Sequence, residues 1–323
     1  MTTYKEINGT NIEAVSSDPA NPVTGQVWYN TTTNVVKGLA QTTAGAWATG
    51  GNLNTGREQL GGAGATRDAA LAFGGSPPPA PTAKAITESY NGTSWTEVND
   101  LNSQRAFVTG AGTQTSAIAA GGDQYSGVAE SWNGTSWTSI TNEPTGSNAY
   151  GGAGADSTNA LFFGGSPPTT TTRYWNGSSW AALGGLNTAR SGIAGAGKTY
   201  TAALAAGGSN SPPVRLAIVE SFNGSSWTEI ADLNDARAWA GGTGTTTSAL
   251  VFGGDTPGTT GNTEEWNGSA WTETTDLSTA RSTGAPAGAD NTNALYAGGS
   301  PDTTATEEWT GAGSPLVQTF TDS

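Results

Sequence analysis

Six of the pairs of adjacent glycines in this 323-residue chain recur at a nearly even spacing. The pairs begin at Gly74, Gly121, Gly164, Gly207, Gly253 and Gly298, and consecutive pairs are 43 to 47 residues apart. A period of this length without helical periodicity is typical of a unit of four short strands. The 48 glycines and the many Thr and Asn residues also favour strands and tight turns over helices. The sequence therefore predicts an all-β fold built from six repeated units.

Each unit carries further residues at the same phase. An Arg stands 16 or 17 residues before five of the pairs, with Asn148 in its place in the third unit: Arg57, Arg105, Arg190, Arg237 and Arg281. An aromatic residue follows each pair after a loop: Tyr90, Trp132, Trp175, Phe222, Trp266 and Trp309. In five units Asn-Gly comes next and then a second aromatic: Trp95, Trp137, Trp180, Trp227 and Trp271. Because Asn-Gly favours a type I′ hairpin turn, each unit is predicted to hold strands a (from the Arg), b (ending at Gly-Gly), c (first aromatic) and d (Trp).

The last unit lacks a Trp after Trp309, whereas Trp47 precedes the first unit. Trp47 stands five residues before the segment 52–54, as Trp95 stands five before the segment 100–102. We therefore expect the strand around Trp47 to pair with the strand around Trp309 and to close a six-bladed β-propeller, which leaves no free sheet edge. An alternative assigns this outer strand to the segment Leu316 to Phe320.

The first 44 residues do not follow the repeat. Two strand-like segments, 25–30 and 35–38, flank the polar segment 31–34 and predict a β-hairpin. The expected domains are an attachment segment with this hairpin at 1–44, a six-bladed propeller at 45–311 and a C-terminal tail at 312–323. Since an isolated two-stranded hairpin is marginal in water, we expect the first segment to gain order from a neighbour.

Two resemblances rest on these residues. The order Arg, Gly-rich strand, Gly-Gly, aromatic and Trp between Trp47 and Trp309 resembles the kelch motif, although kelch repeats usually have Tyr where most units here have Trp or Phe. The segment 25–30 with Lys37 and Gly38 resembles a short module of bacteriophage virion proteins, followed here by a kelch-like array as in structural proteins of marine phages. The resemblance implies a tail-fibre, head-fibre or decoration protein, placed in virions assembled in the host cytoplasm and joined to other virion proteins through the N-terminal segment. It leaves a homo-oligomer open.

Composition disfavours several classes of function. The chain has 26 acidic and 12 basic residues, and its net charge of -14 disfavours nucleic-acid binding. It has no Cys and no His, which removes the thiolate and imidazole groups on which much catalysis and metal binding depend. The copper chemistry of kelch-like galactose oxidases therefore does not carry over. We expect no catalytic residue, cofactor or metal, and neither a secretory signal nor membrane insertion. A carbohydrate-active enzyme using carboxylates and a kelch-type interaction adaptor stay open as alternatives.

Recurrence at one phase favours structural roles for most conspicuous residues. The Arg series is expected to pack on aromatics and donate to the backbone of the neighbouring blade, with an anion-binding ring as the alternative. The Trp series is expected to be core, with carbohydrate stacking as the alternative. The repeated Glu88, Glu130, Glu220, Glu264 and Glu307 are expected to be blade positions. Asp100, Asp232 and Asp276 are expected to cap turns, with a cation site as the alternative.

Recognition is expected on the variable loops between strands b and c, since variable loops on a rigid scaffold commonly carry binding. Their ligand would be host surface carbohydrate or protein. The candidate residues on these loops are Pro78, Tyr125, Pro167, Arg215, Asp255 and Asp302.

Overall fold

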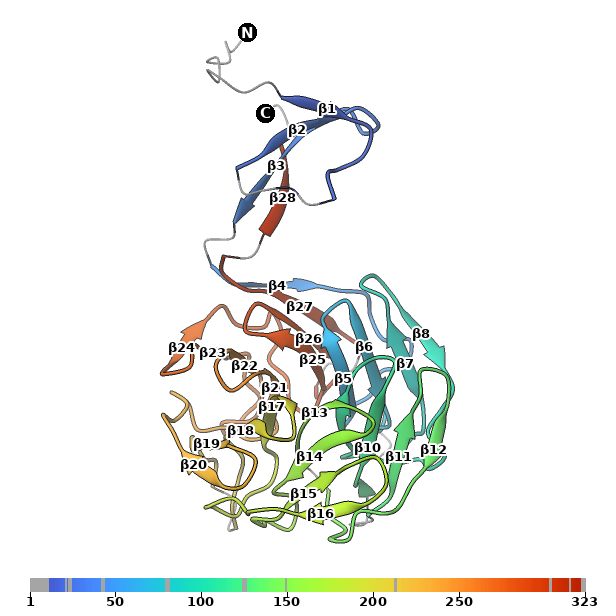
Figure 1. Cartoon of the computed structure of the whole chain (residues 1–323), viewed down its shortest axis with the longest axis vertical. Helices are drawn as coiled ribbons and strands as arrows, with labels where there is room; N and C mark the ends of the chain where they lie inside the picture. The colour runs from blue at the N-terminus through green and yellow to red at the C-terminus, as the bar shows by residue number, and fades with distance from the viewer. Residues whose placement is uncertain are drawn as a thin grey trace. The chain divides into compact units, whose positions relative to one another are not determined.

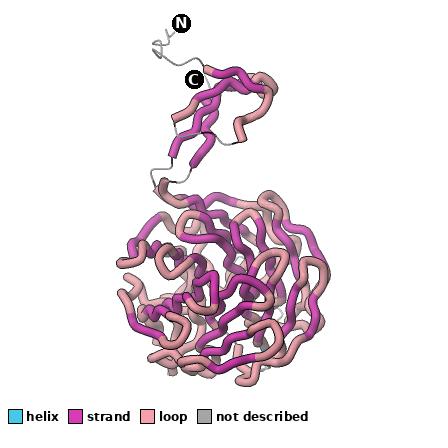
Figure 2. Tube along the Cα trace, in the orientation of Figure 1, coloured by secondary structure: helices cyan, strands magenta, loops and turns pink. Residues whose placement is uncertain are grey.

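The computed structural model shows an all-β chain, consistent with a β-propeller-like fold (Figures 1 and 2). It describes residues 12–20, 22, 25–41, 44–78, 82–123, 127–148, 150–211, 214–301, 304–313 and 315–320. The strands in this part of the chain form seven four-stranded sheets. No helix in these ranges is long and apolar enough to cross a membrane.

The chain divides into two units, which we call the small unit (residues 1–45 and 311–323) and the repeat unit (residues 46–310). The small unit holds one sheet in the order β1-β2-β3-β28, formed by Glu13–Val15, Val27–Asn30, Val35–Gln41 and Pro315–Phe320. The antiparallel pairing of β2 with β3 confirms the predicted hairpin. The C-terminal segment, expected as a tail, supplies β28, which pairs antiparallel with β3. The alternative that this segment completes the last repeat is therefore wrong.

Trp28 anchors the small unit, since its side chain is completely buried. Its Nε1 donates to Asp18 Oδ1 at 3.0 Å, and Asn30 Nδ2 donates to the same oxygen at 2.8 Å. Lys37 Nζ lies 2.7 Å from Asp18 Oδ2. The hydrogen bond from Lys37 is the main reason that the pKa of Asp18 falls to about 2. One carboxylate thus ties the segment before β2 to both strands of the hairpin.

The repeat unit holds six sheets, each antiparallel throughout and numbered here in chain order. The first consists of β5 (Gly61–Thr66), β6 (Ala69–Phe73), β7 (Thr87–Tyr90) and β8 (Trp95–Val98). The second consists of β9 (Thr109–Gly112), β10 (Ala117–Ala120), β11 (Ala129–Trp132) and β12 (Trp137–Ser139), and the third of β13 (Gly151–Asp156), β14 (Asn159–Phe163), β15 (Thr172–Trp175) and β16 (Trp180–Ala182). The fourth consists of β17 (Ala194–Thr199), β18 (Ala202–Ala206), β19 (Val219–Phe222) and β20 (Trp227–Glu229), and the fifth of β21 (Gly241–Gly244), β22 (Ala249–Phe252), β23 (Thr263–Trp266) and β24 (Trp271–Thr274). The sixth consists of β25 (Ala285–Asp290), β26 (Asn293–Ala297), β27 (Thr306–Thr310) and β4 (Ala46–Thr49).

The sixth sheet joins the two ends of the repeat unit. Trp47 on β4 stands opposite Trp309 on β27, which confirms the predicted pairing. The first strands of the sheets contact one another in the order β5, β9, β13, β17, β21 and β25, and β25 also contacts β5. Figure 1 shows β5, β13, β17, β21 and β25 near the middle of this unit and β8, β12, β16, β20 and β24 at its rim.

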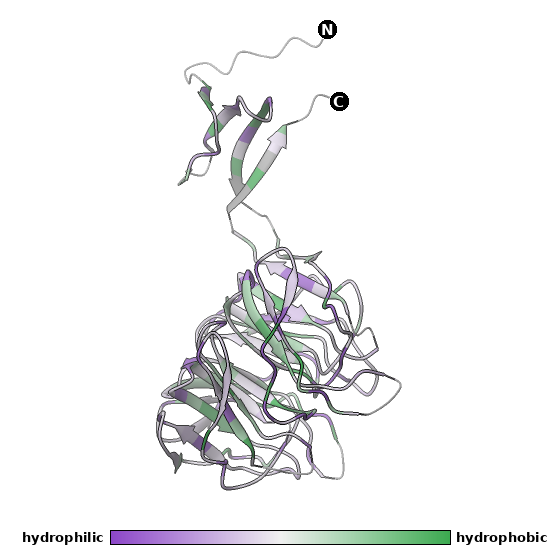
Figure 3. Ribbon diagram, turned by 90° about the vertical axis from the view of Figure 1, so that its right-hand side faces the viewer, coloured by the Kyte–Doolittle hydropathy of each residue, from purple (hydrophilic) through white to green (hydrophobic). Residues whose placement is uncertain are grey.

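The hydrophobic core is divided between the sheets. It forms six clusters, and each cluster takes its residues from two consecutive sheets. One of them combines Leu295 of the sixth sheet with Tyr90 and Trp95 of the first. The hydrophobic stretches accordingly lie on the strands (Figure 3). Each sheet therefore depends on both of its neighbours for burial of its apolar faces.

The turns between strands c and d differ from the expected type I′ geometry. Tyr90 pairs directly with Trp95, so four residues form the connection in the first sheet. Gly92 has a φ of 86°, whereas Asn91 keeps a negative φ. The Asn91 side chain instead accepts hydrogen bonds from the backbone N–H groups of Thr93 (3.0 Å) and Ser94 (2.9 Å). The Asn in each Asn-Gly pair thus acts through its amide oxygen rather than through a left-handed backbone.

Candidate functional site

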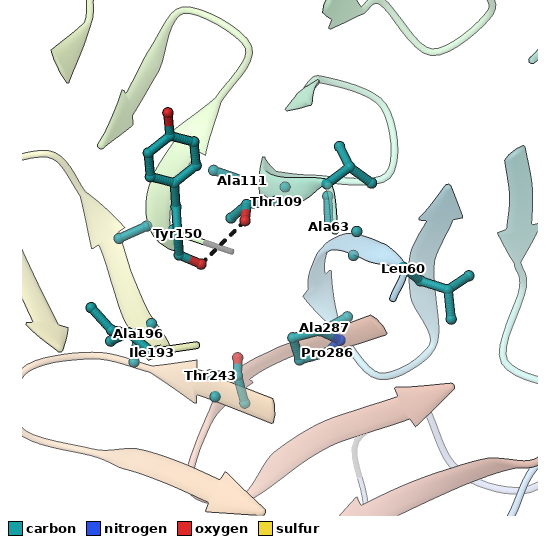
Figure 4. Close-up of a pocket in the computed structure, with 18 of the residues that line it drawn as sticks. Leu60, Ala63, Thr109, Ala111, Tyr150, Ile193, Ala196, Thr243, Pro286 and Ala287 are labelled. Carbon is teal, nitrogen blue, oxygen red and sulfur yellow. Dashed lines mark hydrogen bonds between the residues drawn. The ribbon is translucent and has the colours of Figure 1, made fainter. Parts of the chain in front are cut away.

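A cavity of about 150 Å³ lies between the first strands of the six sheets. Its wall is made largely of Gly, Ala and bare backbone. Figure 4 shows Ala63, Ala111, Ala196 and Ala287, each from a different strand, around one open space. The cavity is the natural place to look for a binding site, because ligand sites are concave and commonly lie where several elements converge.

The Gly-rich pattern of these strands has a steric cause. A Cβ on Gly110 would lie 2.2 Å from the carbonyl oxygen of Gly62 on the preceding sheet, and a Cβ on Gly195 would lie 2.4 Å from that of Gly152. No side chain fits at such distances. Glycine therefore lets consecutive first strands approach backbone to backbone, and it leaves the cavity wall rich in peptide groups.

A partial ring of left-handed residues, with members in five of the six sheets, borders the end of the cavity on the side of the b-to-c loops. The residue two positions after the Arg has a positive φ in five sheets: Gln59 (61°), Phe107 (53°), Gly192 (63°), Trp239 (61°) and Thr283 (59°). Backbone hydrogen bonds connect these residues. The N–H of Phe107 donates to Gln59 O at 2.9 Å, and that of Gln59 donates to Thr283 O at 2.8 Å. The N–H of Thr283 donates to Trp239 O at 3.0 Å, and that of Trp239 donates to Gly192 O at 2.8 Å.

Two aromatic side chains of this ring meet. The ring centroids of Phe107, in the second sheet, and Trp239, in the fifth, lie 5.6 Å apart, and both side chains are partly exposed. A left-handed backbone costs a bulky residue on the order of 1–2 kcal/mol relative to glycine. Glycine is compatible with the position, as Gly192 shows. Backbone geometry therefore does not explain why residues 107 and 239 are aromatic.

Lys198 lies near the opposite end of the cavity. It is the only charged side chain among the described residues that line the cavity, and it follows the Gly-rich run of β17. The other sheets have Ala65, Thr113, Ala155, Thr245 and Ala289 at this position. Its Nζ donates to the carbonyl oxygen of Gly288 in the sixth sheet and so passes over the fifth. Burial lowers the pKa of Lys198 to about 8, and the charge of Asp290 opposes that shift.

The Arg series is buried, in agreement with a structural role. Each of its five guanidinium groups forms an ion pair with the Glu on strand c of the same sheet: Arg57–Glu88 (2.8 Å), Arg105–Glu130 (3.0 Å), Arg190–Glu220 (3.0 Å), Arg237–Glu264 (2.5 Å) and Arg281–Glu307 (3.0 Å). Burial lowers the pKa of Arg57, and the charge of Glu88 opposes that shift. These groups do not line the cavity.

The Arg side chains donate to the backbone of their own sheet, so the expectation that they donate to the neighbouring blade is wrong. Arg57 Nη1 donates at 2.7 Å to the carbonyl oxygens of Gly74 and Ile86 in its own sheet. The backbone carbonyl makes the contact between sheets: the oxygen of Arg57 accepts a hydrogen bond from the N–H of Gly299 in the sixth sheet at 3.0 Å. The second glycine of the Gly-Gly pair thus holds the next Arg by its main chain.

The third sheet corrects the placement of Asn148. The residue after four of the five Arg residues forms a backbone bridge to the b-to-c loop, as Glu58 does with Ser76, and Asn148 forms that bridge with Ser166. Ser147 therefore stands at the Arg position. The ion pair of this sheet has reversed polarity: Arg173 takes the place of Glu on strand c, and its Nε lies 3.4 Å from Oε1 of the buried Glu143.

Four of the five Trp side chains of the Trp series are buried in the core, as expected, whereas that of Trp180 in the third sheet is only partly buried. Trp95 Nε1 donates to Thr306 Oγ1 of the preceding sheet at 2.9 Å, and Trp137 Nε1 donates to Thr87 Oγ1 at 3.0 Å. The Asp residues accept from the first N–H of strand c, as Asp100 does from Thr87 at 3.1 Å. No cluster of three or more His, Cys, Asp or Glu side chains suited to a metal ion occurs among the described residues.

The structure brings together two of the six candidate loop residues. Arg215 and Asp255 come from the loops of the fourth and fifth sheets and form an ion pair at 2.5 Å. Asp255 also pairs through its backbone with Ala238, the residue before Trp239. Pro78 and Pro167 are exposed on separate loops. Tyr125 and Asp302 lie outside the described residues.

Sequence analysis overlooked Phe107, Trp239 and Lys198. Their signal is that they break the repeat: of the 12 Trp residues, only Trp28 and Trp239 are outside the c and d positions. Residues that recur in every unit explain the scaffold, whereas residues that occur once point to the site.

A comparison of the sequence with protein-family models and with curated proteins finds no match.

Proposed function

We propose that the repeat unit is a closed, six-bladed, kelch-like propeller belonging to a bacteriophage virion protein, either a fibre or a decoration component. The small unit attaches the chain to other virion proteins, and the loop face of the propeller binds a host surface glycan or receptor. The chain has no catalytic role in this proposal.

Closure is supported by three features of the repeat unit. The outer strand of the sixth sheet comes from the start of the unit, through the pairing of Trp47 with Trp309. The first strands of the sixth and first sheets are in contact. A hydrophobic cluster joins the same two sheets. Such closure removes the free edges through which sheets aggregate.

The observation that carries the recognition role is the contact between Phe107 and Trp239 at the loop end of the cavity. Aromatic rings that are partly exposed, and held there at a cost in backbone strain, are suited to stacking on the apolar face of a sugar ring. Gln59 and Thr283 belong to the same hydrogen-bonded ring and can supply an amide and a hydroxyl to sugar hydroxyls. We therefore assign glycan contact to this end of the cavity.

The state of the acidic residues supports a binding protein over a carboxylate enzyme. A glycosidase needs two carboxyl groups that face one substrate bond. The recurring Glu residues are instead buried in ion pairs with Arg, one in each of five sheets. They are distributed around the scaffold and do not converge on the cavity.

The recognition role is tested with the full chain and Trp239→Gly, which gives the fifth sheet the residue that the fourth has as Gly192. Since glycine suits the left-handed backbone, we expect the variant to fold while its binding to immobilised bacterial surface polysaccharides is lost. Thr283→Gly is the matched control at the same ring position, and we expect it to bind more weakly than the unmodified chain without losing binding. Unchanged binding by Trp239→Gly would move recognition to another surface.

The virion role is tested by locating the chain on purified phage particles with a labelled antibody. The complete chain should join particles, whereas a fragment of residues 46–310 should stay soluble, melt cooperatively and fail to join them. If the fragment still assembles onto particles, attachment lies on the propeller, and the loop face is a docking surface.

A further inference from the structure

We propose that the cavity end at Lys198 binds a short-chain monocarboxylate, with the Lys198 ammonium group as its anchor. This goes beyond the proposed function, because it concerns the end opposite the loop face and a ligand smaller than a glycan. The proposal rests on the charge state of the cavity wall and on the hydrogen bonds left open at Nζ.

Lys198 forms no ion pair within 4.0 Å, and the charge of Asp290 only partly offsets the effect of its burial. Of the eleven described basic residues, nine lie within 4.0 Å of a carboxylate, and the exceptions in this set are Lys84 and Lys198. Burial is the main cause of the lowered pKa of Lys198. A charge removed from water is costly unless it is paired. In a chain with 26 acidic residues, a cation in the central cavity that no described carboxylate approaches within 4.0 Å is an anomaly that an anionic ligand would resolve.

The hydrogen bonds leave room for that ligand. An ammonium group has three donors, and the described residues provide one acceptor to Nζ, the carbonyl oxygen of Gly288. The same oxygen accepts from Thr243 Oγ1 at 2.9 Å, so both of its lone pairs are in use. A carboxylate can take the remaining donors and would replace the water that a charged amine otherwise retains.

The cavity wall near Lys198 indicates what the rest of the ligand, beyond its carboxylate, should be. Next to Lys198, the cavity is lined by methyl groups such as those of Ala153, Ala196 and Ala287, which suit a short alkyl chain. The whole cavity, with the aromatic end included, has a volume of about 150 Å³, which is below the roughly 300 Å³ from which drug-sized pockets begin. One cation balances one negative charge, whereas a dianion would bring uncompensated charge into an acidic protein.

The site is separate from the aromatic end. Lys198 is five residues along its strand from Ile193, so the two ends are about 16 Å apart at the usual rise of a strand. A short carboxylate cannot span that distance. Trp239→Gly should therefore leave carboxylate binding intact, which keeps failure of this proposal distinct from failure of the proposed function.

The experiment titrates the full chain at pH 7 with sodium propionate, with sodium chloride at equal ionic strength as reference. Binding to the native state alone should raise Tm by about 2–4 °C at a concentration about ten times Kd. Lys198→Met should lose this rise, whereas Lys84→Met, the matched removal of the other lysine without an ion pair, should keep it. The rise should also fade above pH 9, where Lys198 has lost its proton.

A second measurement uses the unmodified chain and does not depend on how the variant folds. The chain has four lysines, so ¹³C-lysine labelling gives a spectrum simple enough to follow Lys198 Cε through a pH titration. Bound propionate should raise the pKa of Lys198, because an adjacent anion favours the charged form. The proposal is overturned if propionate and chloride act alike, if Lys198→Met keeps the rise in Tm, or if the pKa of Lys198 is unchanged.

Discussion

The third sheet of the repeat unit and the other five build the same ion pair from opposite ends. In the five, an Arg before strand a reaches a Glu on strand c, and both side chains are almost fully buried. In the third, Glu143 stands in the loop before strand a and Arg173 on strand c. The two partners of this pair also differ in burial: the Arg173 side chain is 24% exposed, whereas that of Glu143 is fully buried.

The difference shows that the repeat conserves an interaction rather than a residue. Glu143 keeps its charge buried by accepting hydrogen bonds from its own loop, including one from Gly146 N at 2.9 Å, and one from Tyr150 Oη at 2.7 Å. In the other sheets the Glu also accepts such hydrogen bonds, as Glu264 does from Asn234 N at 2.7 Å and Asn234 Nδ2 at 2.8 Å. The pairs differ in the Arg, whose side chain is fully buried at Arg237 and 24% exposed at Arg173. The reversed pair should therefore tolerate loss of its Arg better than the standard pair does.

The largest expected effect separates the two pairs directly. Arg237→Ala leaves Glu264 buried without its partner and should lower the free energy of unfolding by about 3–5 kcal/mol. Arg173→Ala removes a partly exposed partner and should cost about 1 kcal/mol or less. Chemical denaturation of both variants measures the difference, and equal losses would contradict the distinction. Polysaccharide binding by folded Arg237→Ala should be unchanged, since Arg237 lies away from the cavity wall; lost binding at full stability would make the series functional.

Lys198 extends the comparison to a buried cation that forms no ion pair within 4.0 Å and donates to a backbone carbonyl instead. Its pKa is lowered to about 8 from an ordinary value of 10.5, so the unfolded chain binds more protons between these values and stability should rise with pH across this window. Below pH 8 the unfavourable contribution is fully present, at about 3 kcal/mol. Lys198→Met should thus stabilise the protein at pH 7 and flatten its stability between pH 8 and 10.5. Denaturation midpoints across that window test the sign, and a loss of stability at pH 7 would contradict it.

The smallest effect concerns the outer Trp residues. Trp227 Nε1 donates to Thr172 Oγ1 at 2.9 Å in a buried contact between sheets, whereas Trp180, in the third sheet, donates to Thr141 O at 2.7 Å in an exposed one. Trp227→Phe leaves a buried hydroxyl unpaired and should cost about 1–3 kcal/mol. Trp180→Phe should cost about 1 kcal/mol or less, because water can satisfy the carbonyl. A larger loss for Trp180→Phe would mean that the third sheet is held as tightly as the others.

The scaffold could be predicted because its constraints recur. Glycine is required wherever first strands meet backbone to backbone, as Gly110 meets Gly62. The Gly-Gly pairs that made the period visible recur for another reason, since both glycines of each pair have a positive φ, as Gly74 (66°) and Gly75 (87°) do. The pairing of Trp47 with Trp309 followed from counting d-strand residues. The Arg series and the Glu series both lack a member in the third unit, so the sequence alone could have indicated that Arg and Glu form a pair.

What could not be predicted occurs once or depends on geometry. Nothing in the sequence around Phe107 or Trp239 indicates a left-handed backbone, since that is imposed by hydrogen bonds between sheets. The strand β28 pairs with a segment about 280 residues earlier, and Pro315 at its start argues against a strand at the sequence level. The environment of Lys198 depends on Gly288, two sheets away in the fold.

The pairing of Ala46 with Thr310 determines how the repeat unit would respond to mechanical load. Both covalent connections to the small unit leave from this one pair of neighbouring residues. If the small unit is anchored to a particle and the loop face holds a host surface, tension enters through two adjacent strands that are pulled in the same direction. Such a pull does not separate β4 from β27, so each connection takes about half of the force. The two units are thus connected by two chain segments that share the load. If either segment is cut, the whole force acts on one strand and should separate that strand from its sheet.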